Sequence, residues 1–529
     1  MWFVVDLLIS NGTIIDGSGE PGFAGTVIVE GDTLAVRRGG AGDLHAARSI
    51  DARGCIVCPG FIDLHSHAGL TILGAPEHEP KVRQGVTTEL IGVDGISHAP
   101  FKSAAERDRF IWMDSGLNSY PPVPADWLTV ADLLQKLDNA VAVNMAFILG
   151  NAPLRIWAVG WEERPATERE IAEMRAVLRE ATEDGAWALS SGLDYPPGSY
   201  ADRRELASLM TEAARSGGFY HTHTRSQLRR QGALRPWEEA LDIGRMSGGA
   251  VHFTHYYQPL GSPAAAEAYL DLVDAARTEG RDVTFDCYTY PYSSTTATIL
   301  IPSWAKNGGP ERLMEALRNP NERARIKEAL TSKDRVLRWE VGWLTSFRRP
   351  ENAPYDGRLI PEIAAMRRQE PAEALLDLLL EEELHVTWVG AWVTEATIPH
   401  FVAHPQGMIA SDAIVFGDWP SPRTYGCFPL VLGRFVREEG HLSLPEAIRK
   451  MTAAPARRLG LRDRGLLRDG YKADIVIFDP EAVDARATRE TPRAFPTGIE
   501  YVIVNGRTVI ERGTHTGALP GRALRRGRD

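Results

Sequence analysis

The sequence predicts an α/β fold, namely a (β/α)₈ TIM-type barrel with a small composite β-domain made from both chain ends. Short apolar runs typical of buried strands alternate with helical patterns over about 400 residues, which favours a parallel sheet closed into a barrel. The two ends of the chain are rich in strand and turn patterns instead. The alternative, an open doubly wound sheet, needs a glycine-rich phosphate loop after its first strand. Gly60 precedes that strand and no such run follows it.

The composition is that of an ordinary globular protein. Hydrophobic residues make up 43% and charged residues 24% of the 529 residues, which excludes a disordered chain, collagen and a coiled coil. The 59 Lys and Arg against 70 Asp and Glu give a net charge of −11, which disfavours a nucleic-acid partner. No apolar run approaches the ~18 residues of a membrane span, no signal peptide precedes the first strand, and four cysteines are too few for a disulfide framework. We therefore expect a cytoplasmic protein with no membrane or nucleic-acid partner.

Nine segments are candidates for the eight barrel strands, so we expect one of the last three to lie outside the barrel. Between them run helices such as the one after Thr167, where Thr167 and Glu170 form a capping-box pattern and Gly185 ends the helix. The nine segments are 61–67, 87–95, 143–150, 187–192, 218–224, 250–256, 282–290, 385–392 and 407–413.

The domain division follows from where the alternation begins and ends. Residues 1–54 and 466–529 are predicted to pair into the composite β-domain, because neither end alone has enough strands to bury a sheet face. In the first end, Asn11-Gly12 is a strong hairpin dipeptide. Residues 55–465 form the predicted barrel, with an insertion at about 293–370, and long inserts at barrel loops are usually functional lids.

Histidines and one aspartate stand at the ends of several predicted strands. His65 and His67 stand at i and i+2 on the first predicted strand, and the period of two sends both side chains to one face. His223, His255 and Asp412 end the fifth, sixth and last strands. The carboxyl ends of barrel strands meet at the mouth where active sites form, and nitrogen and oxygen ligands of this kind suit zinc. Each histidine alone is more often structural, but the whole set favours a metal site.

A series of motifs runs through nearly the whole chain. The segments are PGFIDLHSH, GVTTELIG, GAWALSSGLDYPPGSYADRREL, THTR, VHFTHY, IASDA, PRTYGCF, KMTAAPARRLGL, GYKADIVIFDP, VNGRTVI and TGALPGRAL. In their order and spacing they make the chain similar to the D-aminoacylase branch of the amidohydrolase superfamily. The resemblance implies a barrel with a composite β-domain and zinc-dependent hydrolysis of N-acyl-D-amino acids.

The resemblance also implies a ligand set. His65 and His67 correspond to ligands of the more exposed metal together with Asp412, and His223 and His255 to ligands of the other metal. The family has a cysteine in the turn after the second strand, where this chain has Asp94. A carboxylate can bridge two ions but is harder than a thiolate. We therefore expect one or two Zn²⁺ ions, or another divalent metal, with Asp94 as an additional ligand.

The substrate-binding pattern departs from the family more than the metal pattern does. Tyr257 stands where the family has a lysine that reaches the substrate carboxylate, and Ser421 replaces the histidine of a His-Pro-Arg element. Arg423 survives and can bind a carboxylate with two hydrogen bonds. Tyr290 and Tyr292 match the family's Tyr-Pro-Tyr element, whose tyrosine can contact the substrate. We expect weak use of substrates with two carboxylates, unless another basic residue such as Arg225 supplies a second cation.

The predicted function is hydrolysis of a linear amide, a small molecule of the N-acyl-D-amino acid type, by metal-activated water. Asp412 is the expected catalytic residue, which accepts the proton of the water and passes it to the leaving nitrogen. Two alternatives remain at this point. One is a cyclic amide or imide hydrolase of the hydantoinase or dihydroorotase kind, and the other is a non-catalytic barrel that serves as a binding module.

Overall fold

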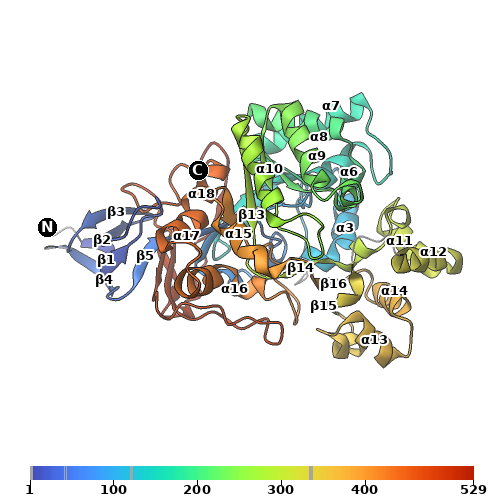
Figure 1. The fold of residues 1–529 in the computed structure, drawn as a ribbon. Coiled ribbons are helices and arrows are strands. Elements are labelled where there is room, and N and C mark those ends of the chain that lie inside the picture. The colour runs from blue at the N-terminus through green and yellow to red at the C-terminus, as the bar shows by residue number, and fades with distance from the viewer. Residues whose placement is uncertain (1–3, 41, 43, 119–122, 333–337) are drawn as a thin grey trace.

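The computed structural model describes residues 4–40, 42, 44–118, 123–332 and 338–529. Figure 1 shows the barrel in the middle of the molecule, the β-domain at one end and a largely helical insertion at the other. In the described residues no helix combines the length and the apolar character that crossing a membrane requires.

Eight parallel strands of the described residues form the barrel, with β8 and β9 counted as one interrupted strand. Strands pair in parallel from β6 to β8 and from β9 to β17. A hydrogen bond from Ile148 N to Ile91 O (2.9 Å) joins these two parts, and a parallel bridge between Ser66 and Ala413 closes the ring. The strands are β6 (Phe61–Asp63), β7 (Val86–Ile91), β8 (Asn144–Phe147), β9 (Leu149–Gly150), β10 (Leu189–Gly192), β11 (Phe219–His223), β12 (Ala250–Phe253), β13 (Val283–Cys287) and β17 (Gly407–Ile409). The predicted fold class is confirmed.

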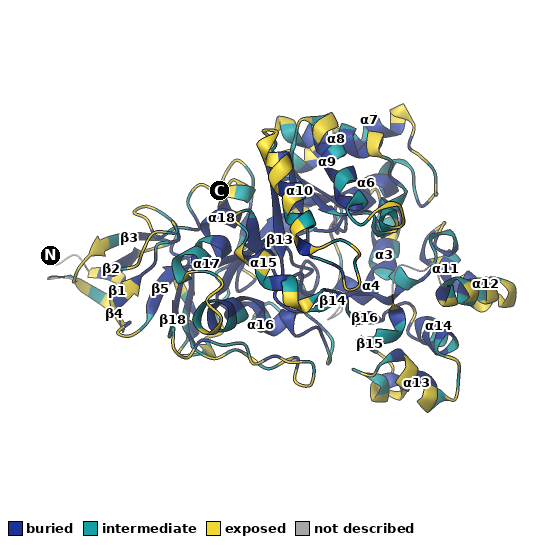
Figure 2. Cartoon of the chain, in the orientation of Figure 1, coloured by how far each residue is buried: buried dark blue, intermediate teal, exposed yellow. Residues whose placement is uncertain are grey.

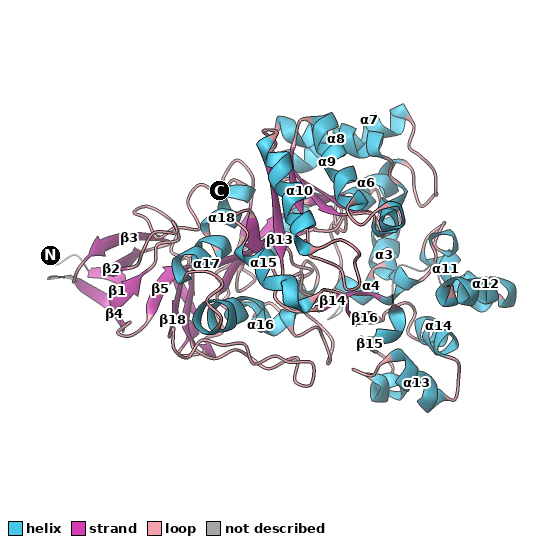
Figure 3. Cartoon of the chain, in the orientation of Figure 1, coloured by secondary structure: helices cyan, strands magenta, loops and turns pink. Residues whose placement is uncertain are grey.

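Helices cover the outside of the barrel, so its strands are buried on both sides (Figures 2 and 3). Helix α7 begins with the predicted capping box of Thr167 and Glu170 and ends at Gly185. The helices that follow the barrel strands are α1 (Thr71–Gly74), α2 (Glu79–Val82), α3 (Ala104–Met113), α4 (Ser115–Asn118), α5 (Val130–Leu137), α6 (Asn151–Ala158), α7 (Glu168–Asp184), α8 (Arg203–Arg215), η2 (Ser226–Gln231), α9 (Arg235–Ser247), α10 (Ala266–Thr278), α15 (Ile398–Ala403), α16 (Arg423–Leu430), α17 (Leu444–Met451) and α18 (Ala453–Leu459).

The two chain ends share one nine-stranded sheet, as the predicted composite β-domain requires. The joining pair is β5 against β18, antiparallel, with Val476 opposite Cys58. Its strands are β1 (Val4–Ile14), β2 (Phe23–Glu30), β3 (Thr33–Arg38), β4 (His45–Asp51), β5 (Ile56–Pro59), β18 (Ile475–Phe478), β19 (Ile499–Val504), β20 (Arg507–Glu511) and β21 (Thr514–His515). The sheet therefore runs past residue 54. The last strand, β22 (Ala523–Leu524), pairs with barrel strand β8 instead.

The hairpin predicted at Asn11-Gly12 does not form. Residues 4–14 are one continuous strand, β1, whose pairing with β2 shifts register between Ile9 and Gly12. Asn11 has φ +64°, a left-handed conformation that asparagine tolerates, so the dipeptide makes a bulge. The parallel partner β4 holds the strand straight from Val4 to Ser10. The strand pattern predicted at the start of the chain also includes Trp2 and Phe3, which lie outside the described residues.

The insertion between β13 and β17 is a separate layer. Strand β16 (Thr387–Ala391) lies between β14 (Tyr292–Thr296) and β15 (Gly342–Thr345) in an antiparallel sheet. The candidate strand 385–392 is therefore the one outside the barrel, as expected for one of the last three, and the insertion continues beyond residue 370. Its longer helices are α11 (Pro310–Arg318), α12 (Pro320–Thr331), α13 (Ile360–Arg367) and α14 (Pro371–Glu381).

Candidate metal centre

The predicted ligand residues all lie at the carboxyl ends of barrel strands. His65 and His67 follow β6, Asp94 follows β7, and Asp412 follows β17. His223 ends β11, and His255 lies two residues beyond β12. The backbone φ angles of Asp94, His255 and Asp412 are +53°, +36° and +48°. Residues other than glycine rarely adopt this left-handed region. Backbone strain of this kind clusters at functional sites.

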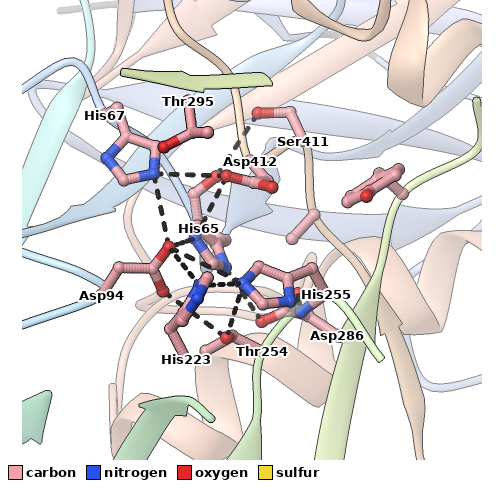
Figure 4. A network of polar contacts seen from close by, with 12 residues as sticks. His65, His67, Asp94, His223, Thr254, His255, Asp286, Thr295, Ser411 and Asp412 are labelled. Atoms are coloured by element: carbon pink, nitrogen blue, oxygen red, sulfur yellow. Dashed lines mark hydrogen bonds and ion pairs between the residues drawn. The ribbon is translucent and has the colours of Figure 1, made fainter. Parts of the chain in front are cut away.

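Four of these side chains converge on one point (Figure 4). His65 Nε2 lies 3.3 Å from Asp94 Oδ2 and 3.4 Å from Asp412 Oδ1. His67 Nε2 lies 3.6 Å and 3.2 Å from the same two oxygens. All four residues are buried. Two imidazoles and two carboxylates that converge in this way form a ligand set suitable for a divalent metal.

A second group of ligands shares Asp94 with the first (Figure 4). Asp94 Oδ2 lies 3.5 Å from His223 Nδ1 and 3.7 Å from His255 Nε2. The two ring nitrogens are only 2.9 Å apart, so a proton or a cation must separate their lone pairs. Asp94 therefore stands between two groups of histidines, in a position from which its carboxylate reaches both.

The buried polar atoms of this cluster fit a metal ion. Both ring nitrogens of His65 are buried and make no hydrogen bond in the described part of the chain, although such atoms are normally paired. Burial lowers the pKa of His65, but the carboxylates of Asp94, Asp412 and Asp286 outweigh it and hold the pKa well above its usual value. Burial raises the pKa of Asp94, yet His65, His223 and His255 bring it well below normal. The cluster thus favours added positive charge.

A second layer of polar contacts holds the ligands in place. Asp286 on β13 accepts a hydrogen bond from His255 N (2.6 Å), pairs with His252 Nε2 (3.1 Å) and lies 3.5 Å from His65 Nδ1. Asp194 pairs with His223 Nε2 at 3.1 Å. Supports of this type fix the orientation and tautomer of metal-binding histidines. Sequence reasoning missed both aspartates, although an aspartate inside the apolar run Val283–Cys287 was a usable signal.

The strand ends that carry His65 and Asp412 are tied together below the cluster. Asp63 Oδ1 accepts hydrogen bonds from His65 N (3.1 Å) and from Ser411 N (3.0 Å). Lys81 on α2 is fully buried, forms an ion pair with Asp63 and donates to Ser411 Oγ at 2.6 Å. Asp412 N donates to His65 O at 2.8 Å. These bonds fix the seam between the first and last barrel strands.

A cavity of about 70 Å³, the inner cavity, lies against the cluster and is lined by Asp94, His223, His255 and Asp412. Its other walls include Tyr195, Tyr257, Tyr288, Trp388 and Trp392. Among the described residues that line the cavity, Arg229 is the only lysine or arginine. Through Asp194, Ser226 and Ile299, which line both spaces, it adjoins a surface hollow of about 450 Å³. A small ligand can therefore place one group at the cluster and extend another outward.

Of the residues expected to bind substrate, Tyr257 lines the inner cavity and four do not. Arg423 is fully buried, forms an ion pair with Asp412 Oδ2 (2.8 Å) and lies over the ring of Tyr288 at 4.2 Å. Its place differs from the expected one because the closed barrel brings α16 directly behind Asp412.

Three further residues expected at the substrate are used in packing. Tyr290 donates its hydroxyl to Ala487 O (3.1 Å), on the side of the β-domain chain end. Tyr292 packs edge-on against Trp343, and its carbonyl accepts a hydrogen bond from Ser421 Oγ at 3.3 Å. Tyr292 and Ser421 thus support the insertion, and Tyr290 joins the loop after β13 to the C-terminal chain end.

The fold and the cluster together define a class of protein. Ligand sets at the carboxyl ends of barrel strands, with an open cavity beside them, are the arrangement of metal-dependent barrel hydrolases. The chain contains this arrangement in full, which disfavours the non-catalytic alternative.

Comparison with known proteins gives the family. Residues 48–510 match the model described as "Amidohydrolase family". The chain is 33% identical to the D-aminoacylase of Alcaligenes xylosoxydans xylosoxydans over 98% of both chains, and 34% identical to the N-acyl-D-aspartate deacylase of the same organism over 98% of this chain and 95% of that one. The N-acyl-D-glutamate deacylase of Bordetella bronchiseptica, solved with zinc and a phosphonate inhibitor, superposes with a TM-score of 0.82 at 31% identity, over 99% of this chain and 100% of that one.

The chain belongs to the amidohydrolase family. It is a metal-dependent hydrolase of carbon–nitrogen bonds other than peptide bonds. The resemblance seen in the sequence is confirmed, and the names of these relatives favour the linear-amide prediction over cyclic amides.

Proposed function

We propose that this protein is a zinc-dependent deacylase of N-acyl-D-amino acids. The observation that supports the proposal most strongly is the convergence of His65, His67, Asp94 and Asp412 with His223 and His255 beside one cavity. The substrate class is inferred from relatives at 33–34% identity, whose names describe removal of the acyl group from N-acyl-D-amino acids.

Two metal positions follow from the two ligand groups. His65, His67 and Asp412 would hold one ion, His223 and His255 the other, and Asp94 would bridge them. A bound Zn²⁺ supplies a Lewis acid for the amide carbonyl and lowers the pKa of water. Asp94 in place of a thiolate makes the site harder, so Mn²⁺ or Co²⁺ are the next ions to test.

Asp412 is the residue proposed to move the proton. Burial raises the pKa of Asp412, but Arg423 and His65 counteract it and bring the pKa to about 2. The carboxylate is therefore ionised at neutral pH and can accept a proton from the attacking water. A weakly basic carboxylate also returns this proton readily to the leaving nitrogen. Arg423 acts here as a positioning residue, because its ion pair fixes the carboxylate.

A substrate screen of the zinc-loaded protein tests the proposal. N-acetyl-D-amino acids should be hydrolysed, with much slower turnover of the L-enantiomers and of a cyclic amide such as a hydantoin. Metal removal with a chelator should abolish turnover, and added Zn²⁺ should restore it. Preferred turnover of the hydantoin would replace the proposal with the cyclic-amide alternative, and turnover that survives chelation would refute the metal assignment.

A further inference from the structure

The carboxylate of an N-acyl amino acid needs a cation in the inner cavity that is not already engaged. Asp94 and Asp412 on its walls are proposed metal ligands and Asp194 holds His223, so these side chains offer none. Arg423 does not resolve this, because it is fully buried and its charge is already paired with Asp412. Tyr257 supplies a phenol, which offers a neutral hydrogen bond and no charge.

Arg229 is the cation that the folded chain brings to this cavity. It lies on η2, the short helix that follows β11, and lines the inner cavity beside Tyr257. Its Nε is buried and has no hydrogen-bond partner among the described residues, and its guanidinium carbon lies 5.7 Å from the ring centre of Trp392. Buried guanidinium nitrogens normally have an acceptor, so the free donor suggests that a ligand supplies one.

Helix η2 is held firmly at its first turn. Arg225 donates to Ser199 O (2.5 Å) and to Ala201 O (2.7 Å), so it does not face the substrate. Ser226 N donates to Asp194 Oδ1 (3.1 Å), and the other oxygen of Asp194 holds His223. The support of Arg229 is therefore connected to a proposed metal ligand. This connection fixes the helix that carries Arg229 relative to the cluster before any substrate arrives.

We infer that Arg229 binds the substrate carboxylate and makes the enzyme selective for N-acyl amino acids that carry a single carboxylate. The guanidinium carbon lies over the ring of Trp392 at 5.7 Å, and the inner cavity has no second Lys or Arg among its described lining residues for another carboxylate. An apolar or aromatic amino-acid side chain suits those walls. The inference rests on the proposed deacylase function and deepens it.

The kinetic test compares a charged substrate with a neutral one. N-acetyl-D-phenylalanine and its primary carboxamide differ only in the carboxylate. Arg229→Gln should lower kcat/KM for the acid at least tenfold, mainly through KM, and change it less than threefold for the carboxamide. Arg229→Lys should recover part of the loss. Arg245→Gln, an exposed arginine on the next helix, α9, that lines neither the inner cavity nor the surface hollow, is the control and should change neither value.

A binding measurement separates this inference from the proposed function. The ketomethylene isostere of N-acetyl-D-phenylalanine has no amide bond to hydrolyse, so calorimetry with the zinc-loaded protein reports affinity alone. Arg229→Gln should raise its Kd at least tenfold, with no change in the Arg245→Gln variant. Equal Kd values in wild type and Arg229→Gln would overturn the role of Arg229, even in an active deacylase. An Arg229-dependent Kd in a protein that hydrolyses no acyl amino acid would refute the deacylase function alone.

Discussion

At the scale of single residues, the cluster combines strain with charge. Positive φ at Asp94, His255 and Asp412 costs on the order of 1–3 kcal/mol per residue. Hydrogen bonds donated by the backbone nitrogens of His255 and Asp412 help to hold two of these residues in place. Arg423 then sets the charge state of Asp412 from behind. The strained backbone thus lowers the stability of the fold, and in return it holds the side chains of the cluster in a fixed arrangement.

Asp412→Asn should leave the fold intact and lower kcat by about 100-fold or more, because an amide cannot accept the proton. Turnover of N-acetyl-D-phenylalanine at saturating substrate and Zn²⁺ measures this effect, with bound zinc determined on the same sample. Asp418→Asn, an exchange in the same loop outside the cluster, is the control. A loss below about tenfold, or ~1.4 kcal/mol in the barrier, would mean that another residue moves the proton.

At the scale of elements, the end of β10 packs directly against the turn that follows β7 and carries Asp94. A Cβ added at Gly192, the last residue of β10, would lie 1.8 Å from Asp94 O. This contact cannot be relieved by a side-chain rotation, because the opposing atom belongs to the backbone. The turn that presents Asp94 therefore depends on the absence of a side chain on the neighbouring strand.

Gly192→Ala should push the Asp94 turn outward and weaken zinc binding at least tenfold. Competition with a chromogenic chelator measures the zinc affinity, and circular dichroism confirms the fold. Gly40→Ala is a suitable control, because a Cβ there meets no heavy atom within 4 Å. An unchanged zinc affinity in the Gly192→Ala variant would show that Asp94 does not contribute to metal binding.

The insertion contains a titrating group away from the metal site. Burial raises the pKa of Asp356 to about 6 from an ordinary 3.8. Below pH 3.8 the folded and unfolded states are both protonated. Between pH 3.8 and about 6 the carboxyl group is ionised in the unfolded state but still protonated in the folded state. The free energy of unfolding therefore falls as pH rises, by up to about 3 kcal/mol.

Asp356→Asn removes this titration. The variant should be more stable than wild type above pH 6, and the difference should vanish below pH 4. Urea unfolding of both proteins from pH 4 to 8 measures it, with Glu328→Gln, which removes an exposed carboxylate on α12 of the same insertion, as the comparison. Parallel stability curves for wild type and Asp356→Asn would contradict the shift.

At the scale of the whole molecule, the chain ends hold the barrel and the β-domain together. The tail pairs as β22 with barrel strand β8, and Trp187 Nε1 donates to Leu524 O at 2.7 Å. Arg525 forms an ion pair with Asp138 at 2.7 Å. The tail contains Arg522, Arg525, Arg526 and Arg528, a composition typical of a solvated chain end. In the structure it nevertheless forms part of the barrel wall.

Deletion of residues 523–529 should therefore lower Tm, on the order of 5 °C, because it exposes β8 and leaves the indole nitrogen of Trp187 without its acceptor. Scanning calorimetry of the zinc-loaded protein measures the change. Arg528→Ala alters only an exposed side chain of the tail and should leave Tm unchanged. An unchanged Tm in the deletion variant would mean that the tail contributes nothing to barrel stability.

The sequence by itself determined the features that depend on short-range order. The i, i+2 spacing placed His65 and His67 on the same side of the barrel mouth, although β6 already ends at Asp63. The capping box of Thr167 and Glu170 began α7, and the order of strands predicted the barrel. Such signals act over a few residues and hold where no distant contact opposes them.

Only the tertiary structure decided which charges meet. Arg423 is paired with Asp412 because the closing strand brings α16 behind the cluster, and Arg229 lines the inner cavity because η2 is fastened through Asp194. Asn11-Gly12 became a bulge because the distant strand β4 extends β1. Ion pairs and edge pairings depend on distances across the closed barrel and between the two chain ends. Local propensity contains no information on those distances.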